Sequence, residues 1–153
     1  MDHAREAAGQ VDPAVALEPD LISICAGGND ILRGGAGDDT YQVSGGGHGY
    51  DTYEDSAGGD DRIVALSDNT RIGLAGEFIG SVAGIETITA NGNNGVTIRS
   101  DNTGSTLDFS GMTLTGIDYI DGQNGDDTII GSSAADVIRG SAGNDTMDGG
   151  DGS

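Results

Sequence analysis

The chain has 153 residues, the usual size of one domain and enough to bury a core without disulfides. Its 26 acidic residues stand against six basic residues, all arginine, and the formal net charge of −20 excludes nucleic acid and anionic membrane surfaces as partners. With 29 glycines and only 35% hydrophobic residues, the composition is close to that of a disordered chain, so folding requires cations that cancel the carboxylate charge. No stretch is apolar over the length of a membrane span, so we expect no membrane insertion.

We predict that residues 1–24 form an N-terminal tail or cap, because they carry both prolines, Pro13 and Pro19, and no repeat. Its alanines predict a short helix over residues 1–10, and residues 15–24 are candidates to cap the first coil of the segment that follows. An interdomain tail with little order is the alternative. The segment lacks the apolar core of a cleaved secretory signal, so any export takes another route.

From residue 25 onward the chain contains nonapeptide units, at 25–33, 34–42, 46–54, 56–64, 113–121, 122–130, 131–139 and 140–148. Each unit has glycine at its fourth position, except for Ala134, and aspartate at its sixth. The aspartates are Asp30, Asp39, Asp51, Asp61, Asp118, Asp127, Asp136 and Asp145. Two residues after each aspartate stands a large apolar residue, in order Leu32, Tyr41, Tyr53, Ile63, Ile120, Ile129, Ile138 and Met147.

Each unit predicts a turn followed by a short strand, because the strand residues point one apolar side chain inward and its neighbours outward. Two units then form one coil of roughly 18 residues. Glycines permit positive φ angles, so that backbone carbonyls curl toward a point to which the aspartate adds a carboxylate. Flexible, anionic oxygen sets are typical of Ca²⁺, whereas Mg²⁺ keeps its waters and demands tighter geometry.

The pattern resembles the nonapeptide G-G-x-G-x-D-x-U-x of the RTX (repeats-in-toxin) family, and units 34–42 and 46–54 fit it in full. The resemblance implies an all-β fold, a right-handed parallel β-roll or β-helix solenoid. It also implies about four or more Ca²⁺ ions, each between a turn and the turn stacked on it one coil later. The implied aspartate pairs are Asp30 with Asp51, Asp39 with Asp61, Asp118 with Asp136, and Asp127 with Asp145. The implied metal-site glycines are Gly28, Gly35, Gly37, Gly47, Gly49, Gly125 and Gly143.

We predict a calcium-binding roll over residues 25–64, metal-poor β-helix coils over 65–112 and a second calcium-binding roll over 113–153. In the middle segment apolar residues keep a spacing of nine or ten without the aspartates, which predicts coils with wider loops near 73–84 and 109–116. Two separate rolls joined by a linker are the alternative. The alternation of Val96, Ile98, Leu107 and Phe109 favours one continuous solenoid, which we expect to be part of a longer protein.

Other chemistry in the sequence has simpler explanations. Adjacent aspartates such as Asp126 and Asp127 resemble the two carboxylates of a glycosidase, but in a repeat one is a ligand and the other a solvated turn residue. No catalytic partner stands at a suitable spacing from His3, His48 or Cys25, so we expect surface histidines and an incidental thiol. The glycine run 45–49 superficially resembles a phosphate-cradling loop, yet it opens no helix. We therefore predict no enzyme activity.

The sequence predicts a calcium-binding structural module of a secreted or cell-surface protein, which folds on binding Ca²⁺ after export and holds neighbouring domains. The family resemblance implies type I secretion. The alternative is a polysaccharide-binding accessory module of a secreted carbohydrate-active enzyme. Polysaccharide binding that depends on Arg71 or Arg99 would favour this alternative. The aromatic content of only 4% argues against this alternative.

Overall fold

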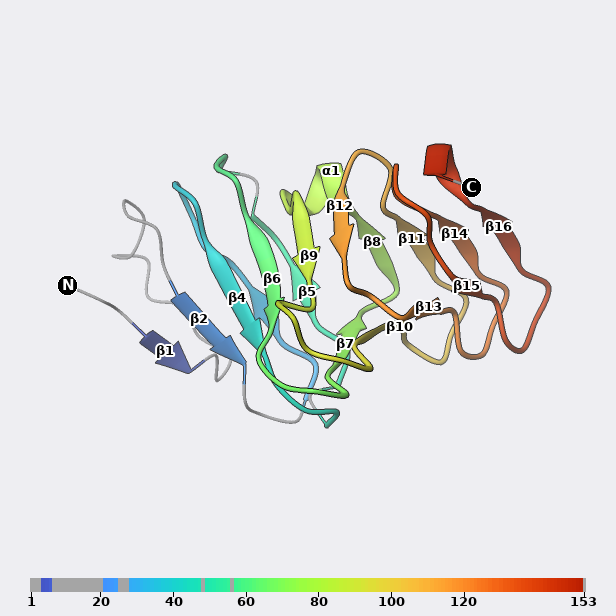
Figure 1. Ribbon diagram of the computed structural model, residues 1–153, viewed down its shortest axis with the longest axis horizontal. Helices are drawn as coiled ribbons and strands as arrows, with labels where there is room; N and C mark the ends of the chain where they lie inside the picture. The colour runs from blue at the N-terminus through green and yellow to red at the C-terminus, as the bar shows by residue number, and fades with distance from the viewer. Residues whose placement is uncertain (1–3, 7–20, 25–27, 48, 56, 153) are drawn as a thin grey trace.

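The computed structural model describes residues 4–6, 21–24, 28–47, 49–55 and 57–152. The predictions made for His3, Cys25 and His48, and for most of the N-terminal segment, lie outside these residues. Within them the chain winds into a parallel β-solenoid of about five turns, with β1 and β16 at opposite ends of the stack (Figure 1). The predicted all-β, parallel solenoid is confirmed, and its right-handed winding stays a prediction.

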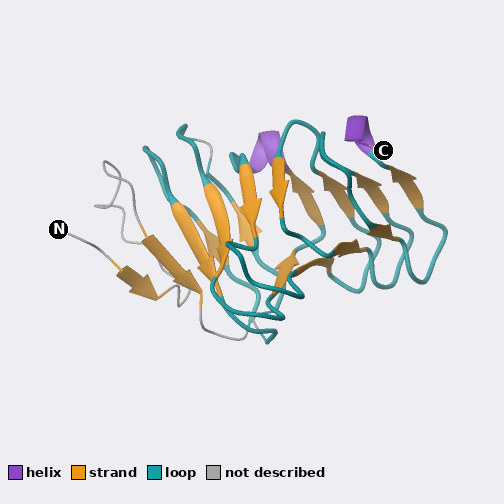
Figure 2. Cartoon of the chain, in the orientation of Figure 1, coloured by secondary structure: helices purple, strands orange, loops and turns teal. Residues whose placement is uncertain are grey.

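Four parallel sheets run along the solenoid, joined by the turns that Figure 2 shows between strands. The longest contains β1 (Ala4–Glu6), β2 (Leu21–Ile24), β4 (Thr40–Val43), β6 (Arg62–Ala65), β9 (Thr87–Thr89) and β12 (Thr113–Thr115). The second contains β7 (Arg71–Leu74), β10 (Thr97–Ser100), β13 (Tyr119–Asp121) and β15 (Ile138–Arg139). The third contains β8 (Glu77–Ile79), β11 (Thr106–Asp108), β14 (Thr128–Ile130) and β16 (Thr146–Asp148), and the fourth β3 (Ile31–Leu32) and β5 (Thr52–Tyr53).

The length of one coil varies along the stack. Ile120 pairs with Ile138, an offset of 18 residues, as two nonapeptides predict. Ile98 pairs with Ile120 at an offset of 22, and Ile72 with Ile98 at an offset of 26. The uniform 18-residue coil is therefore wrong outside the C-terminal turns, because three strands and longer turns are accommodated in each middle coil.

Three local predictions are also wrong. Residues 4–6 form β1 rather than part of a helix, because pairing with β2 outweighs a weak helical propensity. The expected loop 73–84 contains β8 and the short helix α1 (Gly80–Ala83), where Phe78 is buried in the register of Leu107. The expected loop 109–116 contains β12, whose Leu114 packs in the register of Ile88.

The core is a column of inward side chains, usually one from each short strand. Tyr41, Ile63 and Ile88 follow one another in register along the first sheet and are each 0% exposed. Tyr41, Tyr53, Phe78 and Phe109 form a chain of aromatic contacts through the coils, with centroid separations of 5.2, 6.4 and 5.6 Å. Met147 is 52% exposed, because no described coil covers its side of β16.

A short 3₁₀ helix, η2 (Gly150–Gly152), follows β16. No helix in the described ranges has the length and apolar character needed to cross a membrane.

Candidate metal centre

The strand register brings the predicted aspartates together in pairs. The amide of Asp30 donates to Oδ1 of Asp51 at 3.0 Å, that of Asp39 to Oδ1 of Asp61 at 2.7 Å, and that of Asp127 to Oδ1 of Asp145 at 3.0 Å. Extending the register of β13 and β15 by two residues places Asp118 beside Asp136. The carboxylates of Asp51, Asp61 and Asp145 thus lie against the turn of the preceding coil, whereas that of Asp136 accepts hydrogen bonds from Ser132 in its own turn. The role of these aspartates as metal ligands stays a prediction.

We call the stacked acidic residues Asp39 and Asp61, with Asp30 and Asp51, the N-terminal carboxylate ladder. It contains one more acidic residue than the nonapeptides indicate. The amide of Asp61 donates to Oε2 of Glu86 at 2.7 Å, and the register of β6 and β9 places Glu86 at the position that aspartate occupies elsewhere. Sequence reasoning did not assign Glu86 to the site because glutamate replaces the expected residue. Its spacing of two residues before the buried Ile88 was the available signal.

Three buried carboxylates converge at one turn. Asp39, Asp55 and Asp61 each offer a ligand oxygen, all within 4.8 Å of one another, and their exposed fractions are 0%, 1% and 1%. Oδ2 of Asp61 is buried and has no hydrogen-bond partner. Asp55 lies outside the nonapeptide pattern, so no spacing rule identified it.

Asp55 is held in place by contacts from the preceding unit. The hydroxyl of Tyr41 donates to its Oδ2 at 2.6 Å, and the amide of Gly35, a predicted metal-site glycine, donates to its Oδ1 at 3.2 Å. Burial, followed by the hydrogen bond to Asp55, raises the pKa of Tyr41 far above its usual value, so the hydroxyl keeps its proton. The core side chain Tyr41 therefore also positions a carboxylate of the triad.

Repulsion between the three neighbouring carboxylates destabilises the triad when no cation is bound. Two carboxylates at this separation repel by on the order of 3 kcal/mol at an effective dielectric constant of about 20. Burial is the largest cause that raises the pKa of Asp61 to about 6, and the charges of Asp55, Asp39 and Glu86 act in the same direction against the lowering effect of the hydrogen bond from the Asp39 amide. A divalent cation removes this penalty and gives the Asp61 oxygen a partner.

In the units that begin with Gly34, Gly122, Gly131 and Gly140, this first glycine makes room for the carboxylate at the sixth position. A Cβ on Gly34 would lie 2.2 Å from Oδ2 of Asp39 and 2.3 Å from Oδ2 of Asp55. A Cβ on Gly122 would lie 2.5 Å from Oδ2 of Asp127 and 2.8 Å from the carbonyl oxygen of Gly140. The space that the missing side chain leaves is therefore surrounded by carboxylate and carbonyl oxygens, which are the ligands that Ca²⁺ prefers.

The fourth glycine serves the stacking of turns. Gly49 has a φ of 81°, and a Cβ there would lie 1.8 Å from the carbonyl oxygen of Gly28. Gly125 and Gly143 stack in the same way, and so do Gly37 and Gly59, with corresponding separations of 1.8 and 1.9 Å. Two of the predicted metal-site glycines, Gly28 and Gly47, have nothing within 4 Å of their Cβ positions, and Gly47 lies with Gly49 along a pocket beside β7.

The C-terminal ladder repeats the chemistry with less burial. The amide of Ser105 donates to Oδ1 of Asp127 at 2.8 Å, while Oδ2 of Asp127 is buried without a partner. Burial, then the charges of Asp145 and Asp101, raises the pKa of Asp127. Asp136 and Asp145 are half-buried, and Asp118 is exposed.

In the middle coil, hydrogen-bond donors of the protein itself surround the carboxylate of Asp101. Asp101 accepts hydrogen bonds from the amide of Gly76 at 2.9 Å and from the amide of Thr103 at 3.0 Å, as well as from the hydroxyls of Thr103 and Ser105. These donors outweigh burial and lower the pKa of Asp101. A carboxylate supplied with donors in this way remains ionised without a cation.

The first aspartate of each adjacent pair stacks outside the ladder. Asp38 accepts the amide of Asp60 at 3.0 Å, and Asp126 accepts the amide of Asn144 at 2.9 Å, all at exposed positions. In each adjacent pair, therefore, one aspartate belongs to the buried ladder and the other makes an exposed contact between turns.

Parallel coils, oxygen-lined glycine turns and buried carboxylates define a β-solenoid of the calcium-binding class. A family model described as the RTX calcium-binding nonapeptide repeat (4 copies) matches residues 26–48, 112–138 and 121–153. The chain thus contains RTX calcium-binding repeats, and the resemblance predicted from its glycines and aspartates is confirmed. These matches identify a calcium-binding repeat module, whether or not the protein that carries it is an enzyme. No curated protein and no solved structure matches the chain.

Proposed function

We propose that this chain is a structural module of a secreted or cell-surface protein and that it folds when it binds Ca²⁺ outside the cell. The observation that carries the proposal is the buried triad Asp39, Asp55 and Asp61 in a chain of net charge −20. An ion that binds only the folded state contributes its binding free energy to folding. Extracellular calcium modules bind at about 10⁻⁴–10⁻³ M, above cytosolic levels, so folding waits for export.

The proposed sites use residues of two successive coils. At the N-terminal ladder, Asp39 and Asp61 with Asp55 would hold one ion, and Asp30 with Asp51 a second. Towards the C-terminus, Asp127 with Asp145 and Asp118 with Asp136 would hold two more. Each site joins one coil to the next, so the stack gains rigidity along the direction in which it links neighbouring domains.

Far-ultraviolet circular dichroism of the full chain, titrated with Ca²⁺ from a chelated state, tests the proposal. We expect a disordered spectrum in chelator, a cooperative gain of β signal near millimolar Ca²⁺, and little gain with Mg²⁺ at the same concentration. A β spectrum that is identical in chelator and in Ca²⁺ would refute calcium-dependent folding. Isothermal titration calorimetry then measures how many ions bind.

A further inference from the structure

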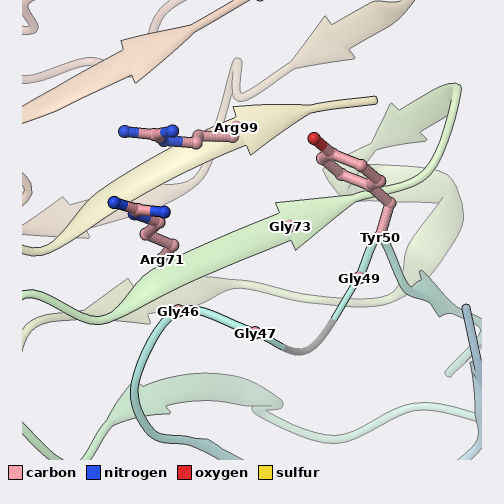
Figure 3. Close-up of a pocket in the computed structure, with 7 residues that line it drawn as sticks. All are labelled: Gly46, Gly47, Gly49, Tyr50, Arg71, Gly73 and Arg99. Atoms are coloured by element: carbon pink, nitrogen blue, oxygen red, sulfur yellow. The ribbon is translucent and has the colours of Figure 1, made fainter. Parts of the chain in front are cut away.

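Two arginines lie side by side on the outer face of the second sheet, although this chain has few cations. Arg71 is on β7 and Arg99 on β10, and the register pairs Arg99 with Gly73, two residues after Arg71. Because side chains two residues apart share a face, both arginines project from the same side of the sheet. Figure 3 shows their guanidinium groups next to each other.

Neither guanidinium has a carboxylate partner among the residues that the structure describes. Within the described ranges, the one ion pair joins Arg33 to Glu54 on other strands. Arg99 donates to the Tyr119 hydroxyl at 3.3 Å, and its Nε is buried without a hydrogen-bond partner. Two adjacent cations and a buried unpaired donor cost free energy that an oxyanion between them would recover.

A glycine-lined hollow of about 260 Å³ adjoins the two arginines. Its other lining residues are Gly46, Gly47, Gly49, Tyr50 and Gly73. A Cβ on Gly73 would lie 2.0 Å from the Gly49 carbonyl oxygen, so glycine at this position lets the segment before Tyr50 cross directly over β7. Tyr50 then stands on the opposite side of Gly73 from the guanidinium groups (Figure 3).

We propose that Arg71, Arg99 and Tyr50 form a binding site for an oxyanion, either a free anion or the acid group of a sugar-sized molecule. Paired guanidinium groups present planar sets of donors that match carboxylate and sulfate oxygens. The hollow is smaller than the roughly 300–1,000 Å³ typical of drug-sized ligands, which limits the occupant to one small anion or one sugar unit. Gly46, Gly47 and Gly49 form one wall, and the arginines supply the charge.

Calorimetry on the calcium-loaded full chain tests this site, with sodium sulfate, glucuronate and neutral glucose as probes. We expect sulfate or glucuronate to bind at one site per chain and glucose to give no heat. Tighter binding of glucuronate than of sulfate would show that Tyr50 and the glycine wall contact the sugar ring. Equal affinities would show that the free anion suffices.

The variants Arg71→Gln and Arg99→Gln should each weaken binding by about tenfold or more, because each removes a charge-assisted contact. Arg62→Gln on β6 is the matched control, because it changes the net charge equally and lies outside the pocket, where its Nε donates to the Thr40 hydroxyl at 3.1 Å. Circular dichroism and the calcium midpoint check folding, and Arg99→Gln keeps the test decisive if Arg71→Gln does not fold. Absence of anion binding by folded wild-type protein, or equal weakening by all three variants, would overturn the proposal without affecting the calcium function.

Discussion

Asp61 has two different oxygens, and each has its own role. Its Oδ1 accepts the amide of Asp39 and links two coils, while its Oδ2 is buried and has no hydrogen-bond partner. Loss of the negative charge should leave the hydrogen-bonding oxygen and remove most of the attraction for a cation.

We therefore expect Asp61→Asn to raise the Ca²⁺ concentration at half-folding by about tenfold, the effect of losing one charged ligand. Circular dichroism during calcium titration measures the shift. Asp60→Asn changes the same charge at the neighbouring, exposed position and should move the midpoint by less than about twofold. Equal shifts in the two variants would mean that net charge, rather than the triad, controls folding.

Gly34 tests the space on which the triad depends. In Gly34→Ala the new methyl group would stand 2.2 Å from Oδ2 of Asp39, so the carboxylate must move out of the site. We expect a loss of about 1–3 kcal/mol in unfolding free energy in saturating Ca²⁺, measured by urea denaturation. Gly76→Ala is the control, because its methyl group would lie 3.6 Å from Asp101 Oδ2, at ordinary contact distance. An unchanged stability of Gly34→Ala would show that this space is not part of the site.

At the scale of elements, the repeating unit is a turn and its strand, which is stable only against the next coil. Strands of two to four residues cannot bury a core alone, and each contributes one or a few inward side chains to the shared column. The carboxylate ladders stand at both ends of the stack, and Asp101 with its protein donors lies between them. The middle coils therefore separate the two carboxylate ladders that we propose bind Ca²⁺.

This separation predicts a local effect of substituting Asp127, which should loosen the C-terminal ladder only. In Asp127→Ala, hydrogen exchange followed by mass spectrometry should show faster exchange over residues 113–152 and unchanged exchange over 28–65. Asp126→Ala, at the exposed neighbour that accepts the Asn144 amide, is the matched control. Faster exchange at both ends would identify the solenoid as one cooperative unit instead.

At the scale of the whole molecule, the net charge of −20 opposes compaction, and protons can replace cations in relieving it. The pKa of Asp61 is raised to about 6 in the folded chain, and burial with neighbouring charges also raises that of Asp127. A carboxyl group whose pKa is higher in the folded state stabilises folding at low pH, and this stability is lost as the pH rises through the folded value.

We expect the calcium-free chain to become more compact and more β-structured between pH 7 and pH 4, with the transition near pH 6. Size-exclusion chromatography and circular dichroism in calcium-free buffer measure it. Asp61→Asn should be less dependent on pH in this range, because it lacks one of the groups that titrate. A calcium-free chain with the same dimensions at both pH values would contradict the expectation.

The spacing of residues in the sequence predicted the features that depend on a single repeat. Glycine and aspartate at regular positions predicted the oxygen-rich turns, and the apolar residue two places later predicted the buried strand centre, as at Tyr41 and Ile63. The stacked aspartate pairs followed from the repeat order, because the turns before corresponding strands must lie against each other. No comparable local signal marked Asp55, whose position depends on how the chain leaves β5.

The tertiary structure alone decided which side chains meet across coils of unequal length. Offsets of 22 and 26 residues in the middle coils depend on how long turns pack, so no fixed period places Arg71 beside Arg99 or Tyr50 over Gly73. The repeat therefore determined the oxygen-rich turns and the strand centres, which are set within nine residues. The buried triad and the arginine pocket depend on contacts between residues far apart in the chain, because only the completed stack brings them within reach.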